Sequence, residues 1–406
     1  MKPELLSPAG DFEKLQMAIA YGADAVYMGG KTMSLRAGSK NFEDDELKRA
    51  MDYARSKKVK AYITVNIFAH NKDFEYMEDY LHHLKEIGAD AVIVSDLGVF
   101  NIARKIGLEI HISTQANVTN LQSLLLYKEL GASRVILARE LSFAEITCIT
   151  REAQPFETEV FVHGAMCMAY SGRCLLSKYM VNRDANQGDC AQPCRWQYTL
   201  SEKPSDKNPH PSPMDIYQDE RGTYILNSKD LCMIEFIPEL VASGVSSLKI
   251  EGRMKSAYYV AIVTNAYRKA LDDFFEYPEK YHANKDYYLR ELQKTNNREF
   301  STGFYLDKAT EGQLTHKEAA ITHDFVGLVL DYNKENSVAT IEQRNKFVTG
   351  DMVEFVKGGF SQQIEEIYTE KGESVTTAPH PQQILYIKTT MPVEKFEIMR
   401  KVGLHL

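Results

Sequence analysis

A short phrase recurs along the first part of the chain and constrains what it can fold into. Each copy opens with a glycine, continues through a mostly apolar run and ends on a polar residue or a glycine. The clearest copies are Gly22–Gly30, Gly88–Asp96, Gly131–Arg139 and Gly244–Gly252. Glycine suits the left-handed cap that ends a helix, and the run after it suits a parallel strand buried on both faces. The phrase therefore predicts a repeated unit in which a helix leads through a glycine turn into a buried strand.

Applied to the whole chain, this pattern predicts strands separated by amphipathic helical stretches. The eight predicted strands are Glu4–Ser7, Ala23–Met28, Lys60–Val65, Ala91–Ser95, Glu109–Thr114, Arg134–Ala138, Glu157–His163 and Ser246–Glu251. The predicted helices are Asp11–Tyr21, Asp44–Lys57, Phe74–Ile87, Leu97–Ile106, Leu121–Leu130, Phe143–Arg151, Asp230–Ser243 and Ala257–Phe275, with a further tyrosine-rich helical segment that ends near Lys294. Such alternation is typical of an α/β fold of the (β/α)8, TIM-like barrel type. A doubly wound open sheet is the alternative, although no G-x-G-x-x-G follows any predicted strand.

The chain has 406 residues, too many for one ordinary core, so more than one domain is expected. We assign residues 1–295 to the barrel, with an insert at 164–226 after the seventh strand, and residues 296–319 to a linker. Short alternating runs then predict a small all-β barrel domain over residues 320–406. Its predicted strands are Phe325–Asp331, Ser337–Glu342, Met352–Val356, Gln363–Tyr368 and Ile384–Thr389. Inside the insert we expect a hairpin of Arg195–Leu200 with Gly222–Leu226, joined by an exposed loop.

Composition is typical of a globular protein, with 44% hydrophobic and 26% charged residues. The N-terminus has no basic stretch followed by an apolar run, and no apolar stretch approaches the ~20 residues that span a bilayer. We therefore expect a cytoplasmic protein without membrane contact. The net charge of −8 disfavours a dedicated nucleic-acid scaffold, but a local basic surface remains compatible with it.

Four of the six cysteines lie close together in the insert, at Cys167, Cys174, Cys190 and Cys194. In the reducing cytosol such a group binds metal more often than it forms disulfides. Structural zinc sites use closely spaced pairs, and the six-residue gap between the first two cysteines fits that pattern poorly. An iron–sulfur cluster tolerates looser spacing, so the spacing favours a cluster over zinc. The other two, Cys148 and Cys232, are predicted to be small core residues.

Polar residues follow most of the predicted strands. In a barrel the C-terminal ends of the strands meet on one rim, where catalytic groups lie. We predict a catalytic group made of His111, Gln115, Asn117, His163, Glu251 and Arg253. Each of these alone is also explained as a helix cap or a loop residue, and it is the shared rim that favours a site.

The cysteine-rich stretch also carries a long pattern. Residues Glu159–Ser177 read E-x-F-x-x-G-A-M-C-x4-G-x-C-x-L-S, which resembles the signature of peptidase family U32. The phrases ELLSPAG at 4–10, ISTQANVTN at 112–120, IEGRMKS at 250–256 and NREFSTGFY at 297–305 resemble the same family. The resemblance covers the barrel and the segment that leads to the C-terminal domain.

The resemblance implies an RNA-modifying enzyme. The better understood members of this family bind an iron–sulfur cluster through four cysteines, which here would be Cys167, Cys174, Cys190 and Cys194, and we expect the cluster to be of the 4Fe–4S type. They make 5-hydroxyuridine at the wobble position of tRNA without dioxygen, and prephenate is implicated as the hydroxyl donor. A dicarboxylate donor needs fixed cations, for which Arg253, Arg173, Arg195 and Lys249 are candidates. The uridine would be extruded into the barrel mouth, where His111, Gln115 and Asn117 are candidates to orient the base.

Two other functions remain open from the sequence. The family was named for collagenase-like peptidases, and a Cys167 nucleophile with His163 or His111 as its base would suit such an enzyme. Four cysteines in one insert nevertheless fit ligands better than one nucleophile and three spares. The other alternative is a non-catalytic RNA-binding protein with a structural metal such as zinc.

Overall fold

The computed structural model describes residues 2–31, 33–34, 41–167, 174, 176–183, 185, 188–195, 217–219, 222–224, 228–306 and 323–402. These residues form two compact units. The first draws on residues 1–12, 24–254 and 298–318, and the second on residues 13–23, 255–297 and 319–406. No helix among the described residues is both long enough and apolar enough to cross a membrane.

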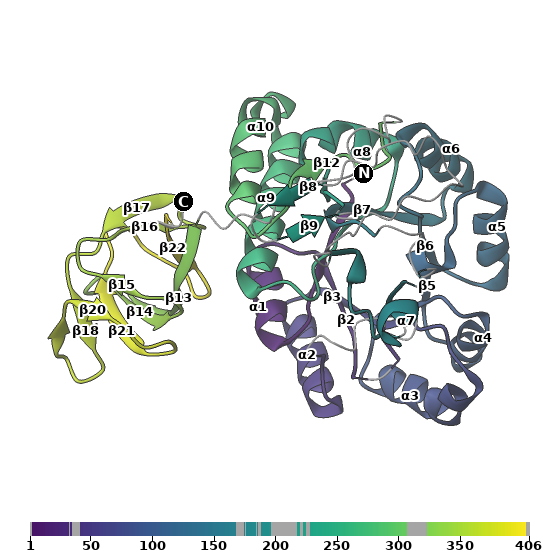
Figure 1. Cartoon of the computed structure of the whole chain (residues 1–406), viewed down its shortest axis with the longest axis horizontal. Coiled ribbons are helices and arrows are strands. Elements are labelled where there is room, and N and C mark those ends of the chain that lie inside the picture. Colours follow the sequence, from purple (N-terminus) through teal and green to yellow (C-terminus); the bar gives the residue numbers. More distant parts are fainter. Residues whose placement is uncertain are drawn as a thin grey trace. The chain divides into compact units, whose positions relative to one another are not determined.

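The first unit contains a closed parallel barrel, as predicted (Figure 1). Its strands are β1 (Glu4–Pro8), β2 (Ala25–Met28), β3 (Lys60–Val65), β4 (Ala91–Val94), β5 (Ile110–Ile112), β6 (Arg134–Ile136), β7 (Glu157–Ala165) and β11 (Ser247–Ile250). Each strand pairs in parallel with the next, and β11 closes the ring by pairing with both β7 and β1. The eight strands are those that the glycine phrase predicts, with ends that differ by at most two residues.

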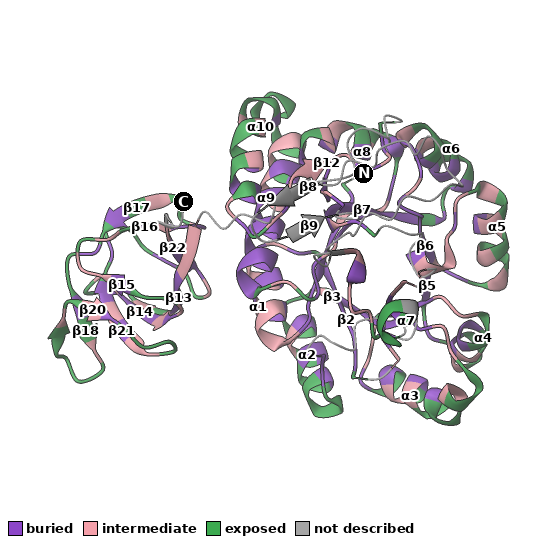
Figure 2. Ribbon diagram, in the orientation of Figure 1, coloured by how far each residue is buried: buried purple, intermediate pink, exposed green. Residues whose placement is uncertain are grey.

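Helices surround these strands. In the first unit they are α2 (Asp44–Ser56), α3 (Phe74–Glu86), α4 (Leu97–Ile106), α5 (Leu121–Leu130), α6 (Phe143–Ala153) and α8 (Ile237–Ser243), with the short α7 (Leu176–Val181) inside the insert. Local signals set their ends. Asp96 caps α4 by accepting hydrogen bonds from the backbone N–H groups of Gly98 and Val99, and Gly107 ends the same helix in the left-handed conformation. Figure 2 shows buried residues on the strands and exposed residues on the outer faces of the helices.

The predicted start of one helix in the barrel unit is wrong. The helix predicted to begin at Asp230 begins at Ile237, beside Pro238 in its first turn. The segment before it forms a strand, β10 (Asp230–Cys232), which pairs antiparallel with the end of β7 and parallel with β12 (Phe300–Ser301). The hydrophobic pattern did not reveal β10, because a strand of three residues is too short for its periodicity to be recognised.

The described part of the insert hairpin has a pairing that the sequence did not predict. Gly222–Tyr224 (β9) pairs with Tyr217–Asp219 (β8), which the sequence placed in the exposed loop. Arg195 instead ends a 3-10 turn, Pro193–Arg195, and residues 196–200 lie outside the described residues. A two-residue connection between β8 and β9 closes a local hairpin at less entropic cost than the long loop that we expected.

The second unit combines three helices with the predicted all-β domain. The helices are α1 (Phe12–Ala20), α9 (Ala257–Glu276) and α10 (Pro278–Gln293). The main antiparallel sheet has the order β17-β16-β22-β13-β14-β21-β18-β19, and a smaller sheet pairs β15 with β20. The strands are β13 (His323–Asn333), β14 (Val338–Gln343), β15 (Phe347–Val348), β16 (Met352–Phe355), β17 (Phe360–Gln363), β18 (Ile367–Thr369), β19 (Ser374–Val375), β20 (Thr377–Ala378), β21 (Ile384–Lys388) and β22 (Ile398–Val402).

One predicted strand of this domain is wrong, and several of its strands were not predicted from the sequence. The predicted strand Gln363–Tyr368 spans the end of β17, a connection and the start of β18. Among the strands not predicted, β22 carries Arg400, which is fully buried and pairs with Glu291 at 2.7 Å and Glu354 at 2.9 Å. A charged residue in the middle of a short strand interrupts the apolar pattern, and its partners lie far away in the sequence.

Candidate active site

The C-terminal ends of β3, β4 and β5 are joined by amide and hydroxyl groups. Asn66 follows β3 and donates hydrogen bonds to Gln115 Oε1 at 3.1 Å and to Ser113 Oγ at 3.3 Å. The Ser95 hydroxyl, after β4, donates to the Asn66 carbonyl oxygen at 2.9 Å. The structure therefore brings Gln115 to the barrel mouth, as predicted. Asn66 was missed as its partner, although the sequence places it directly after a buried strand.

Asn117 lies beside them at the end of a 3-10 turn, Thr114–Ala116 (η2), that follows β5. Its backbone is left-handed, with φ of 56°, a conformation that asparagine tolerates better than most residues. Its side-chain Oδ1 is buried and has no hydrogen-bond partner among the described residues. The next residue, Val118, accepts a hydrogen bond from the Ala138 N–H at 3.1 Å, which ties this turn to the end of β6.

Arg139 follows β6 and is buried in the mouth. Its guanidinium group lies 3.9 Å from the Phe161 ring centroid, donates from Nη1 to the Ala165 carbonyl oxygen at 3.1 Å, and lies 3.5 Å from a Glu251 carboxylate oxygen. Ala165 is two residues from Cys167, so Arg139 fixes the backbone that leads to the first cysteine. The sequence placed Arg139 at a strand end, but nothing in its local pattern distinguished it from a helix-cap residue.

Arg253 occupies another part of the mouth, after β11. The side chain is 3% exposed, and it donates to the Thr64 hydroxyl at 2.7 Å and to the Ser34 hydroxyl at 2.6 Å. A Cβ atom at Gly29 would lie 2.5 Å from the Arg253 Nη1 atom. Glycine after β2 therefore makes room for the guanidinium group, and Arg253 lies where the sequence expected it.

Glu251 and Gly164 meet where β7 and β11 end. Gly164 has φ of 108°, and a Cβ atom there would lie 2.4 Å from the Glu251 carbonyl oxygen. The Glu251 N–H donates to the His163 carbonyl oxygen at 2.8 Å. This close approach explains why the signature has glycine at position 164, and it brings the predicted residues His163 and Glu251 together.

Replacement of Gly164 by alanine should destabilise the barrel unit by about 1–3 kcal/mol, because the left-handed backbone and the short contact act together. The matched control is Gly372→Ala, where φ is 77° but no atom lies within 4 Å of the place that the added methyl group would take. Thermal unfolding of both variants measures the difference. Equal melting temperatures for the two variants would contradict a close approach at Gly164.

His163 lies near the end of β7, where β10 pairs with β7 and β12 pairs with β10. Its ring packs edge-on against Phe300 of β12, with centroids 5.4 Å apart. Two more residues of the segment that contains Phe300 contact the barrel. Tyr305 donates a hydrogen bond to the Phe161 carbonyl oxygen at 2.5 Å, and Arg298 pairs with Asp230 at 2.5 Å. The phrase NREFSTGFY, which begins the predicted linker, therefore packs against the barrel strands of the first unit.

His111 and Lys249 lie inside the barrel, in a buried network of charges. Lys249 pairs with the fully buried Glu159 at 2.8 Å, and Arg134 pairs with the same carboxylate at 3.0 Å. Burial alone would raise the pKa of Glu159, but Lys249 and Arg134 outweigh it and hold the pKa at about 2. His111 contacts Glu109 at 3.2 Å and the Tyr62 ring edge-on, and burial lowers its pKa.

This network has consequences for two predicted site residues. The positive charge of Lys249 is already matched by Glu159, and the side chain lies over the Tyr27 ring at 4.5 Å. His111 is 0% exposed, and its neighbours are those of the barrel interior, whereas Gln115 and Asn117 reach the mouth. Glu159, the first residue of the signature, therefore neutralises buried positive charges inside the barrel.

The insert holds two of its cysteine-bearing segments together. The Ser177 hydroxyl of α7 accepts a hydrogen bond from the backbone N–H of Ala191 at 3.0 Å, and Ala191 directly follows Cys190. Ser177 is the last residue of the signature and lies three residues after Cys174. A role in joining these two segments explains why a serine closes the pattern.

The four cysteines of the insert carry thiol groups, which as thiolates are suitable ligands for a soft metal. Cys167 is exposed, the other three are partly exposed, and none of the four is in a disulfide in the described part of the chain. Thiolates are the ligands that iron–sulfur clusters use. Within the described part of the chain, no three His, Cys, Asp or Glu side chains converge in a geometry that could hold a metal ion. Of the predicted cations of the insert, Arg173 and the Arg195 side chain lie outside the described residues.

The remaining two cysteines differ from each other. Cys232 is buried, as predicted. Cys148 is exposed, so its prediction as a core residue is wrong. The buried face of α6 is formed by Ile146, Ile149, Thr150 and Ala153, and Cys148 lies on the other side of the helix.

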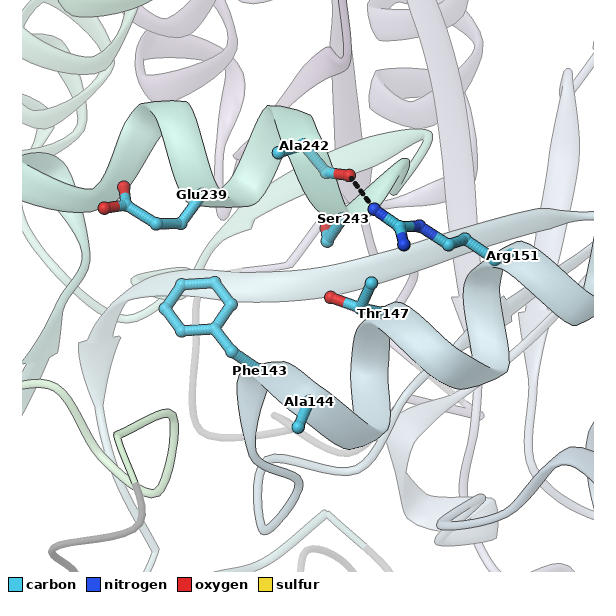
Figure 3. Close-up of a pocket in the computed structure, with 7 residues that line it drawn as sticks. All are labelled: Phe143, Ala144, Thr147, Arg151, Glu239, Ala242 and Ser243. Carbon is cyan, nitrogen blue, oxygen red and sulfur yellow. Dashed lines mark hydrogen bonds between the residues drawn. The ribbon is translucent and has the colours of Figure 1, made fainter.

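A groove runs between α6 and α8 on the outside of the barrel (Figure 3). Its volume is about 420 Å³, and Arg151 closes one end by donating to the Ala242 carbonyl oxygen at 3.5 Å. None of the predicted site residues lines it. The candidate active site is therefore the polar barrel mouth, where Asn66, Gln115, Asn117, Arg139, Glu251 and Arg253 gather.

A parallel barrel with this cysteine-bearing insert and a C-terminal β domain defines the class of protein. The sequence matches peptidase family U32 over residues 10–315 and the peptidase family U32 C-terminal domain over residues 321–400. The chain belongs to peptidase family U32.

Relatives within the family carry different names. The chain is 41% identical to tRNA hydroxylation protein P1 of Bacillus subtilis, over 98% of this chain and 95% of that protein. It is 33% identical to a collagenase of Porphyromonas gingivalis, over 90% of each chain. It is 34% identical to the 23S rRNA 5-hydroxycytidine C2501 synthase of Escherichia coli, over 67% of this chain and 40% of that protein.

Proposed function

We propose that this protein is an RNA-modifying enzyme that hydroxylates the wobble uridine of tRNA to 5-hydroxyuridine in the cytoplasm, without dioxygen. The observation that carries the proposal is the 41% identity with a tRNA hydroxylation protein over almost the whole length of both chains. The relative named for 5-hydroxycytidine synthesis supports hydroxylation of an RNA base as the shared chemistry. The polar barrel mouth offers a place for an extruded base.

The proposal includes an iron–sulfur cluster held by Cys167, Cys174, Cys190 and Cys194. Replacement of the C5 hydrogen of uracil by a hydroxyl group taken from water releases two protons and two electrons, so the reaction needs an external two-electron acceptor. An iron–sulfur cluster held by these residues would relay the electrons to that acceptor. The chain's own residues would bind and orient the reactants. Arg139 would hold the backbone before Cys167 in place, and the Ser177 hydroxyl would hold the segment that carries Cys190.

Prephenate, or a similar small carboxylate, is the proposed hydroxyl donor. Arg253 is the proposed cation for one carboxylate, since the Thr64 and Ser34 hydroxyls to which it donates are neutral and a guanidinium group suits a carboxylate. Arg173 and Arg195 of the insert are the proposed cations for the second carboxylate. Lys249 is the weakest of the four candidates, since its ammonium group already pairs with Glu159.

The test of this proposal is the nucleoside content of tRNA. Deletion of the gene in a strain without redundant paralogues should remove 5-hydroxyuridine and the wobble nucleosides derived from it, as measured by mass spectrometry. Expression of the wild-type chain should restore them. Unchanged amounts of these nucleosides in the deletion strain would exclude tRNA uridine hydroxylation.

A second candidate is peptidase activity, which the similarity to a collagenase favours. In this case Cys167 would act as the nucleophile, and purified protein without a cluster should cleave gelatin. Cys167→Ser should abolish that cleavage, whereas Cys148→Ser should not. Lack of gelatin cleavage by the purified wild-type protein would remove this candidate.

A further inference from the structure

The edge of the mouth at the ends of β5 and β6 carries three side-chain groups with unused hydrogen-bonding capacity. Asn117 Oδ1 and Arg139 Nε are buried without a partner among the described residues. The amide nitrogen of Gln115 likewise has no partner in the described part of the chain, although its oxygen is engaged. A buried polar atom without a hydrogen-bond partner costs free energy, so this edge favours a ligand that supplies the missing bonds.

The three groups lie on adjoining segments. Gln115 and Asn117 belong to the turn after β5 and its cap. That turn is held against the end of β6, because Val118 accepts from the Ala138 N–H at 3.1 Å and the Thr114 hydroxyl donates to the Leu137 carbonyl oxygen at 3.4 Å. Arg139 is the next residue after Ala138, so the segments that carry the three groups adjoin, and the Arg139 guanidinium group extends from there towards Ala165 and Glu251 at the ends of β7 and β11.

Their partners fix which group is a donor and which an acceptor. The Gln115 oxygen accepts from Asn66 at 3.1 Å, so the Gln115 amide nitrogen remains as a donor. The outer nitrogens of Arg139 are used by Ala165 and Glu251, so Nε–H remains as a second donor. Asn117 Oδ1 is an acceptor. The edge therefore presents two donors and one acceptor.

We propose that this edge reads the hydrogen-bonding edge of an extruded uracil and discriminates it from cytosine. Uracil presents two carbonyl oxygens on either side of an N3–H group, which complements two donors and one acceptor. Cytosine has an acceptor at N3, which would face the Asn117 oxygen without a proton between them. Asn117 Oδ1 and Arg139 Nε are buried, so the base must displace the groups that cover them. This inference rests on the proposed function and adds to it the residues by which the site would distinguish uridine from cytidine.

The experiment compares two anticodon stem-loop RNAs that differ only in uridine or cytidine at the wobble position. Fluorescence anisotropy with the full-length protein should show binding of the uridine RNA about tenfold tighter, as expected for one well-placed contact with a base edge. Asn117→Ala should bring the ratio of the two dissociation constants close to one. Asn117→Asp, which keeps an oxygen acceptor, should retain the preference for uridine.

Two further measurements separate base reading from a fold defect. A stem-loop with 3-methyluridine lacks the N3–H group, so it should bind the wild-type protein about tenfold more weakly than the uridine RNA. The Asn117→Ala variant should bind the 3-methyluridine RNA and the uridine RNA equally well. Arg139→Lys keeps the positive charge but removes Nε–H, and it should lower the uridine preference. Thr147→Ala, in the groove between α6 and α8, is the control that should keep the wild-type ratio.

Equal binding of the uridine and cytidine RNAs by the wild-type protein would overturn the inference. So would a preference that survives Asn117→Ala and 3-methylation of the base. These measurements use no product, so they are independent of hydroxylation. A protein that discriminates uridine but forms no 5-hydroxyuridine would support base reading while contradicting the proposed function.

Discussion

Replacement of Cys194 by serine is expected to lower 5-hydroxyuridine formation by at least about a hundredfold, because changes even to the groups that support metal ligands often cost tenfold to a hundredfold. The same variant should lose most of the iron and acid-labile sulfide of anaerobically purified protein. Cys174 and Cys190 should behave in the same way, since the Ser177–Ala191 hydrogen bond links the segments that carry them. Iron and sulfide analysis, with mass spectrometry of tRNA from complemented deletion cells, measures both effects.

The matched control is Cys148→Ser. Cys148 is an exposed thiol on α6, so its loss changes the cysteine count by the same amount without touching the insert. It should leave iron content and hydroxylation at wild-type levels. Full iron content in Cys174→Ser, Cys190→Ser and Cys194→Ser alike would contradict the assignment of these residues as cluster ligands. Zinc in place of iron in anaerobically purified wild-type protein would point to the structural-metal alternative.

Most of the barrel could be predicted from sequence because its signals are local. The glycine that ends a helix and the apolar run after it are neighbours in the chain, so Gly88 and Ala91–Val94 are recognised together. Elements whose partners lie far away in the chain were not recognised. β10 exists because Asp230 and Leu231 pair with Ala165 and Gly164, and nothing within β10 itself signals that pairing.

At the site, too, local features could be predicted from the sequence, whereas side-chain contacts between distant residues could not. Strand ends predicted which residues approach the mouth, and Gln115, Asn117, Glu251 and Arg253 do lie there. The pattern did not show which way a side chain turns. His111 and Lys249 point into the barrel interior, where the Glu159 carboxylate and the Tyr62 and Tyr27 rings receive them. Asn66 and Arg139 emerged only once their partners across neighbouring strands were known.

Replacement of Glu159 by glutamine should lower the free energy of unfolding of the barrel unit by about 3–5 kcal/mol, because it leaves buried Lys249 and Arg134 without their shared negative charge. Urea unfolding followed by circular dichroism measures the loss. Glu157→Gln is the control: its carboxylate also pairs with Arg134 but is 47% exposed, so its loss should cost less than about 1 kcal/mol. Equal destabilisation by the two variants would contradict a buried hub at Glu159.

A double variant and a pH series identify the charge as the cause. Glu159→Leu combined with Lys249→Met removes the buried Glu159–Lys249 pair and leaves Arg134 its salt bridges to Glu4 and Glu157. It should recover much of the stability that Glu159→Gln loses. The Glu159 pKa of about 2 in the folded chain lies below its ordinary value of 4.5. Its contribution is therefore fully present above pH 4.5 and is lost as the pH falls towards 2. Over that window Glu159→Gln should lose less stability than the wild-type protein, and the two unfolding curves should converge. Parallel pH dependence in both proteins would show that the signature glutamate stabilises the barrel by something other than its charge.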